Sequence, residues 1–178
     1  MQAKGVYALS AFSVESIYYH TELQKRVAER QSAVSGTNLQ EMLDSARNAA
    51  LDAIKPHIQR LSERVVEATV RHNLMQQLPR REDIAAAQPI SVTIEVANVV
   101  AQEAGRLQQA CEAGDLASII ARYPVRETPA LKSIVDRLGF QSRKQYEGAV
   151  GKLLMEDAKA LEFVRGLFGA LPAEITKA

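Results

Sequence analysis

A chain of 178 residues is long enough for one ordinary domain, which would bury roughly 70% of the surface of its unfolded chain. The apolar fraction of 47% and the charged fraction of 24% are typical of a soluble globular protein, and the formal net charge of +1 excludes a globally basic nucleic-acid binder. Its single cysteine excludes an internal disulfide, it has no apolar run of roughly 20 residues, and we expect no signal peptide. We therefore expect a cytoplasmic protein that has no contact with a membrane.

The first predicted element is a short strand. Residues 5–12, Gly-Val-Tyr-Ala-Leu-Ser-Ala-Phe, include aromatic and β-branched side chains that favour extended structure. A strand needs a partner, and residues 90–96 alternate apolar and polar side chains in the manner of a second strand. The two runs could form a small two-stranded ribbon. Alternatively, each could be an extended lead-in to the helix that follows it.

Two helices should come next. Ser13 is a candidate N-cap for a short helix over residues 14–19. Thr21 and Gln24 have the spacing of a capping box, which predicts a second helix beginning at Thr21. The Ser-Gly pair that ends at Gly36 should terminate this second helix.

A long apolar stripe follows over residues 39–78, and the rest of the fold should be organised around it. Its side chains recur at steps of three and four, which place them on one side of an α-helix. Thr37 or Asn38 should cap this helix, and Pro56, which has no backbone N–H, should kink it or restart it. The stripe consists of Leu39, Leu43, Ala46, Ala50, Ile54, Ile58, Leu61, Val65 and Ala68.

The remaining helices are separated by glycines and prolines. The helical pattern resumes over residues 97–113, and the helices after it should begin at side chains that accept a hydrogen bond from the backbone. The candidate caps are Asp115, Thr128, Ser142 and Asp157. The sequence thus predicts a mainly α fold, a helical bundle around a long kinked helix with at most one small ribbon. We divide it into a helical body, residues 1–120, and a C-terminal helical cluster, residues 121–178, that together form one continuous domain.

The segment 131–146 has the spacing of a helix-turn-helix, with two helices joined by a short Gly-Phe turn. It resembles the reading unit of AraC-type regulators, in which such a turn precedes a capped helix with an aromatic residue on its inner face. The residues that match are Gly139, Phe140, Ser142 and Tyr146. A tight helical hairpin of any function also requires a glycine at its corner and apolar residues inside.

The resemblance to AraC-type regulators implies a DNA-binding surface. Arg143 and Lys144 would open the recognition helix and reach phosphates or base edges, with Lys132 and Arg137 beside them. Residues 122–152 hold seven Lys or Arg against three acidic residues, a local excess of +4. DNA binding through a helix-turn-helix at residues 131–150 is therefore the alternative function that the sequence suggests.

Three further segments resemble the helical C-terminal region of bacterial ABC- or AAA-type ATPases with Toprim-like domains. These OLD-like proteins often serve in phage defence. The segments are Phe-Ser-Val-Glu-Ser-Ile at 12–17, Arg-Tyr-Pro-Val-Arg-Glu-Thr at 122–128 and Leu-Gly-Phe at 138–140. The resemblance implies that residues 5–9 correspond to the final Toprim strand and that this chain is part of a longer protein.

The catalytic residues of such ATPases correspond to nothing in this sequence. It has no Gly-x-x-x-x-Gly-Lys-Ser/Thr phosphate loop and no Asp-x-Asp pair for Mg²⁺, and its three histidines are far apart. We therefore expect no catalytic residue, metal or cofactor. Cys111 falls on a buried stripe, where a thiol usually acts as a small hydrophobe.

The expected function is that of a non-catalytic helical interaction module. Its partner would be another protein or the remainder of a larger ATPase chain, and the long stripe would favour a homo-oligomer if part of it stays bare. Tyr123 and Arg126, together with Arg80 and Arg81, are the candidate interaction residues. For Arg126 we favour a structural role, as an ion pair with Glu127 or with an acidic residue of the long helix.

Overall fold

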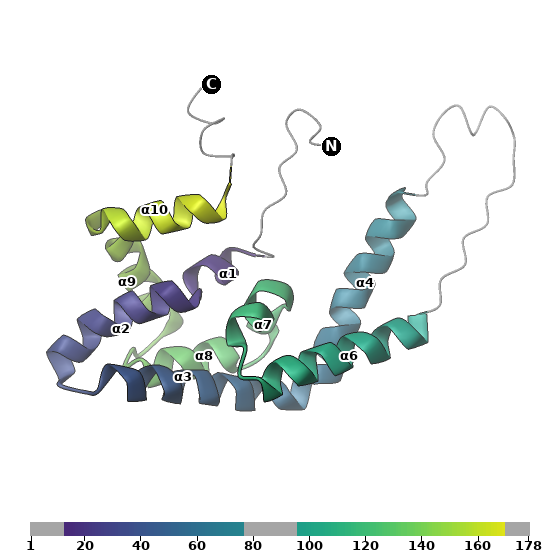
Figure 1. Ribbon diagram of the computed structural model, residues 1–178, viewed down its shortest axis with the longest axis horizontal. Coiled ribbons are helices and arrows are strands. Elements are labelled where there is room, and N and C mark those ends of the chain that lie inside the picture. Colours follow the sequence, from purple (N-terminus) through teal and green to yellow (C-terminus); the bar gives the residue numbers. More distant parts are fainter. Residues whose placement is uncertain (1–12, 77–95, 170–178) are drawn as a thin grey trace, which may run out of the picture.

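The computed structural model describes residues 13–76 and 96–169, and every regular element within these ranges is a helix (Figure 1). In chain order they are α1 (Val14–Tyr18), α2 (Thr21–Ser35), α3 (Leu39–Ile54), the 3₁₀ turn η1 (Lys55–His57), α4 (Ile58–Gln76), α6 (Val96–Glu112), α7 (Leu116–Arg122), the 3₁₀ turn η2 (Val125–Glu127), α8 (Ala130–Arg137), α9 (Arg143–Glu156) and α10 (Ala158–Leu167). The predicted mainly α bundle is confirmed. Both predicted strands lie outside the described residues, except for Val96, which begins α6 instead.

The predicted kink at Pro56 is confirmed. Pro56 lies in η1, where the backbone tightens into a 3₁₀ turn between α3 and α4. In Figure 1, α3 runs along the lower edge of the molecule and α4 leaves it at a steep angle. The change of direction gives the two helices different partners, because α3 packs mainly against α8 and α4 mainly against α6.

The core is one continuous cluster of buried side chains, to which both predicted parts of the chain contribute. Ala46 and Ala50 of α3 are completely buried, and their small side chains suit the close approach of α8, which buries Ile134 and Val135. Most of the predicted stripe is buried or half-buried, but Ala68 near the end is exposed. Burial of each large aliphatic side chain stabilises the fold by about 1.5–3 kcal/mol.

Side-chain caps begin α3, α7 and α10 where the sequence indicated them. Asn38 accepts hydrogen bonds from two backbone N–H groups of α3, at 2.9 and 3.4 Å, and Asp157 accepts two at the start of α10. Asp115 accepts one at the start of α7, and Thr128 accepts one from the N–H of Ala130. Each such bond satisfies a helix-end N–H that has no partner inside the helix.

The predicted capping box at Thr21 is wrong. His20 caps α2, because its Nδ1 accepts a hydrogen bond from the N–H of Glu22 at 3.2 Å, and Thr21 is the first helical residue. The imidazole also packs edge-on against Phe163 of α10, with ring centroids 4.8 Å apart. Burial lowers the pKa of His20, which favours the neutral ring that an acceptor nitrogen requires.

Candidate functional site

The turn between α8 and α9 has the glycine, the cap and the buried aromatic residue that the sequence predicted. Gly139 turns the chain with a φ of +81°, and Ser142 caps α9 by accepting a hydrogen bond from the N–H of Gln145 at 3.2 Å. The Oε1 of Gln145 accepts from the N–H of Gln141, the residue before the cap, at 2.7 Å, whereas a capping box would use the N–H of Ser142. Tyr146 is completely buried, as expected for the inner face of α9.

The four residues predicted to bind nucleic acid differ in their surroundings. The Arg143 guanidinium donates to the Tyr19 hydroxyl at 3.3 Å, contacts Glu147 at 3.2 Å and lies 5.8 Å from the centre of the Tyr19 ring. The contacts with Tyr19 attach α9 to the end of α1, whereas Glu147 lies on α9 itself. Lys132 pairs with Asp136 along α8. Arg137 and Lys144 are exposed, and the structure gives neither an ion pair within its described ranges.

Tyr123, one of the predicted interaction residues, has a buried structural partner. Its hydroxyl donates to Oε1 of Glu103 on α6 at 2.6 Å, and the Arg122 guanidinium donates to both carboxylate oxygens of Glu103 at 2.6 and 2.8 Å. The hydrogen bond with Arg122 lowers the pKa of Glu103, although burial opposes the shift. This Glu103 network joins the end of α7 to α6. The sequence did not predict it, because no local pattern relates Glu103 to Arg122 and Tyr123, which lie about 20 positions later.

Arg126 has a structural partner, but a different one from that predicted. It contacts Glu15 of α1 at 3.6 Å. Glu127 instead contacts Arg64 of α4 at 3.2 Å, and Arg60 donates to the backbone carbonyl of Glu127 at 2.6 Å. Two adjacent residues of η2 therefore connect this turn to two different helices: Arg126 to α1 and Glu127 to α4.

Arg80 and Arg81, the other predicted interaction residues, lie outside the described residues. Arg71, near the end of α4, pairs with Glu67 one turn earlier at 2.7 Å. Cys111 is buried, and burial raises the pKa of its thiol, which suits the predicted role of a small hydrophobe. In residues 13–76 and 96–169, no three side chains of His, Cys, Asp or Glu converge on a possible metal position.

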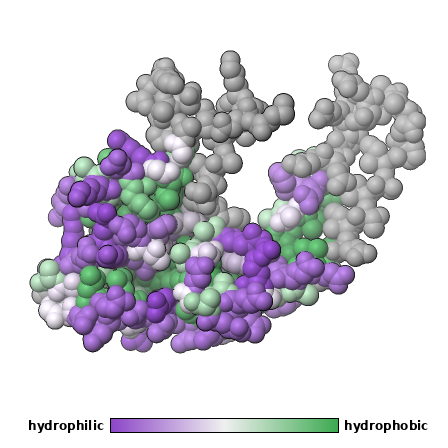
Figure 2. Space-filling model, in the orientation of Figure 1, coloured by the Kyte–Doolittle hydropathy of each residue, from purple (hydrophilic) through white to green (hydrophobic). Residues whose placement is uncertain are grey.

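The ends of α4 and α6 farthest from the body expose apolar side chains. No described side chain of α4 after Val66 is buried, and none of α6 before Glu103. Figure 1 shows the two helices diverging toward these ends, and Figure 2 shows apolar surface between them. We call the exposed apolar residues near the end of α4 and the start of α6 the distal patch: Leu74, Met75, Val96 and Val99. Their spacing in sequence is that of an ordinary buried stripe, so only the fold reveals their exposure.

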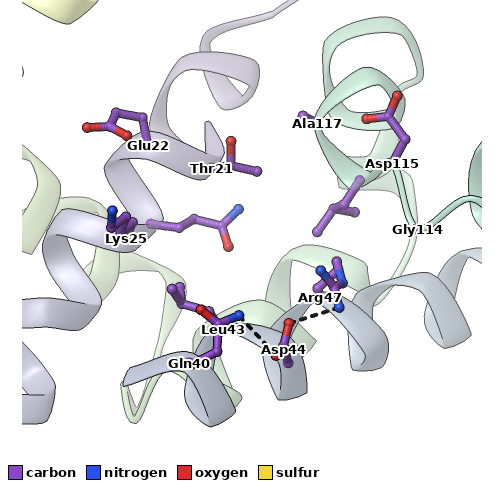
Figure 3. Close-up of a pocket in the computed structure, with 12 residues that line it drawn as sticks. Thr21, Glu22, Lys25, Gln40, Leu43, Asp44, Arg47, Gly114, Asp115 and Ala117 are labelled. Atoms are coloured by element: carbon purple, nitrogen blue, oxygen red, sulfur yellow. Dashed lines mark hydrogen bonds and ion pairs between the residues drawn. The ribbon is translucent and has the colours of Figure 1, made fainter. Parts of the chain in front are cut away.

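A second surface feature is a cleft of about 400 Å³ between the first turns of α2, the first half of α3 and the start of α7 (Figure 3). Leu43 and Leu116 give it apolar surface, and Lys25, Asp44 and Arg47 are among the charged residues around it. The sequence analysis named Leu43 only as part of the apolar stripe and did not single out the others, because they belong to three segments that only the fold brings together.

None of the helices in the described part of the chain is long and apolar enough to span a membrane. A scan against protein-family models and searches of curated proteins and of solved structures found no match to this chain. Function is therefore inferred from the residues and their geometry, and the resemblance to ATPase C-terminal regions remains an expectation.

Proposed function

We propose that this chain is a helical interaction module that docks onto another protein through the distal patch. The exposure of large apolar side chains on both α4 and α6 is the observation that carries the proposal. Met75 is 68% exposed, and Leu74, Val96 and Val99 are each about two-fifths exposed. Single apolar side chains are common on protein surfaces, but a group at one end of a helix pair favours a binding surface.

A partner that covered the distal patch would gain hydrophobic free energy. The two helices meet near the start of α4 and diverge beyond it, so neither covers the apolar face of the other at the far end (Figure 1). Covering an exposed methionine or leucine removes apolar area from water and contributes roughly 1–2 kcal/mol. Several such side chains can support a specific interface if a polar rim surrounds them.

The resemblance described above indicates the class of partner. In OLD-like proteins a helical region of this kind accompanies an ABC- or AAA-type ATPase and a Toprim-like domain. The proposed partner is such an ATPase region, either as the remainder of the same polypeptide or as a separate chain. The structural roles of Tyr123 and Arg126 support a module whose own contacts hold it together.

The experiment is a calorimetric titration of a purified ATPase–Toprim region from the same genome into this chain. A double variant, Met75→Glu with Val99→Glu, places two carboxylates in the distal patch, and Met155→Glu is the matched control because Met155 is 82% exposed on α9. We expect binding that the double variant weakens at least about tenfold and the control leaves unchanged. Absence of binding, or equal binding by the double variant, would contradict the proposal.

Light scattering of the isolated chain distinguishes self-association from partner binding. A monomer agrees with an external partner for the distal patch. A dimer that the same double variant dissociates would assign the patch to a second copy of the chain and would contradict the ATPase partner.

A second candidate function is DNA binding through the α8–α9 turn, and the exposure of Arg137 and Lys144 favours it. Fluorescence anisotropy with duplex DNA at two salt concentrations would show binding that weakens as salt rises. Arg137→Glu with Lys144→Glu should abolish this binding, whereas Lys159→Glu on α10 should reduce it less. Binding that the double variant leaves unchanged would exclude readout by this turn.

A further inference from the structure

The cleft between α2, α3 and α7 combines apolar surface with polar groups that have fixed positions. Leu43 of α3 and Leu116 of α7 supply apolar lining, and Gln24 of α2 lies beside them. The side chain of Gln24 is buried, and its Nε2 donates to the carbonyl of Tyr19 at 2.6 Å, so the amide oxygen is the atom left to accept from a ligand. A cleft of about 400 Å³ has room for a few residues of a peptide.

The carboxylates around the cleft already have partners in the chain. Glu22 pairs with Arg26 at 2.8 Å, and Asp115 caps α7 through the N–H of Ser118 at 3.0 Å. Asp44 pairs with Arg47 at 2.8 Å and accepts from Gln40 at 3.0 Å, as the dashed lines in Figure 3 show. Glu22 and Asp44 are thus each paired with an arginine, and Asp115 is engaged by a backbone N–H at the start of α7.

Two cations line the cleft, Arg47 and Lys25, and Arg47 is already paired with Asp44. Lys25 lies on the α2 side and is exposed, and the described residues offer it no ion pair within 4 Å. A ligand carboxylate at this position would therefore gain an ammonium partner without breaking a pair that already exists.

We infer that this cleft binds a short peptide segment in which an acidic side chain is flanked by apolar residues. The carboxylate would pair with Lys25, the apolar neighbours would contact Leu43 and Leu116, and a peptide N–H would donate to Gln24. The inference does not depend on the distal patch. Its test uses a peptide instead of the ATPase region, so either proposal can fail without the other.

The test is an NMR titration of the ¹⁵N-labelled full chain with the peptide acetyl-Leu-Glu-Leu-amide and, separately, with acetyl-Leu-Gln-Leu-amide. We expect saturable shifts of the backbone amides of Lys25, Leu43 and Gly114, with the glutamate peptide binding about two- to fivefold more tightly. Lys25→Ala should remove that preference. Lys159→Ala, the same change at an exposed lysine of α10, should keep it.

Lys25→Ala should fold, because Lys25 is exposed and alanine is a strong helix former, and a well-dispersed spectrum of the variant checks this. Three results would overturn the inference: no saturable shifts at the cleft, equal affinity for the two peptides, or a preference for glutamate that survives Lys25→Ala.

Discussion

Replacement of Glu103 by glutamine tests the buried network that holds α6 to the end of α7. Glu103 is 7% exposed and accepts hydrogen bonds from Arg122, at 2.6 and 2.8 Å, from Tyr123 at 2.6 Å and from Arg106 at 3.2 Å. Glutamine keeps one acceptor oxygen, but its NH₂ group replaces the second carboxylate oxygen and points a donor at groups that are themselves donors.

The expected loss of stability is about 2 kcal/mol. Removal of one partner from a buried ion pair costs roughly 3–5 kcal/mol when the other charge stays dry. The Arg122 side chain is 45% exposed and recovers hydration, whereas the buried Tyr123 hydroxyl does not. The loss should therefore lie below that range.

The assay is urea unfolding followed by circular dichroism, at pH 7 and at pH values below 4. Because the pKa of Glu103 is lower in the folded chain than its ordinary value of 4.5, the charged network stabilises the fold above that value. That stabilisation disappears as the pH falls through the lowered pKa, so the difference between wild type and Glu103→Gln should shrink in acid. Glu112→Gln, an exposed change on the same helix, should alter stability by less than about 0.5 kcal/mol. Equal losses in the two variants would refute the reasoning.

Three further experiments test a glycine turn, a helix cap and the buried thiol. Gly139→Ala should lower the free energy of unfolding by about 1–2 kcal/mol, because the φ of Gly139 is +81°. Gly148→Ala should instead raise it by up to about 1 kcal/mol, because Gly148 lies inside α9 and its new Cβ would meet no atom within 4 Å. Urea unfolding compares the two variants. Asn38→Ala should cost about 1 kcal/mol in the same assay, because it removes the acceptor at the start of α3, and an unchanged midpoint would contradict this. Cys111 should react with Ellman's reagent at pH 8 at least about tenfold more slowly in the folded chain than in urea, because burial shields the thiol and raises its pKa, and equal rates would argue against that burial.

The local features of the fold could be predicted from the sequence because they depend on neighbouring residues. The break at Pro56, the glycine turn at Gly139 and the caps at Asn38 and Asp157 each follow from one side chain and the backbone beside it. The error at His20 has the same origin. Thr21 matched a familiar capping pattern, whereas a histidine cap also depends on the packing of its ring against α10.

The surfaces could not be predicted, because they depend on contacts between distant segments. The contact between Arg143 and Tyr19 joins residues 124 positions apart, which no local pattern relates. The pairing of Arg126 with Glu15 likewise joins segments that no local pattern relates. For Met75 the sequence shows an apolar residue at helical spacing, and only the divergence of α4 and α6 leaves it exposed.

The most direct test of the proposed module measures both folding and binding in the variant that combines Met75→Glu with Val99→Glu. Because Met75 and Val99 are exposed in the isolated chain, replacing both by glutamate should leave the free energy of unfolding within about 0.5 kcal/mol of wild type. The same variant should lose at least about tenfold of its affinity for the ATPase–Toprim region by calorimetry. Affinity equal to that of the wild type, in a variant that folds normally, would contradict docking through the distal patch.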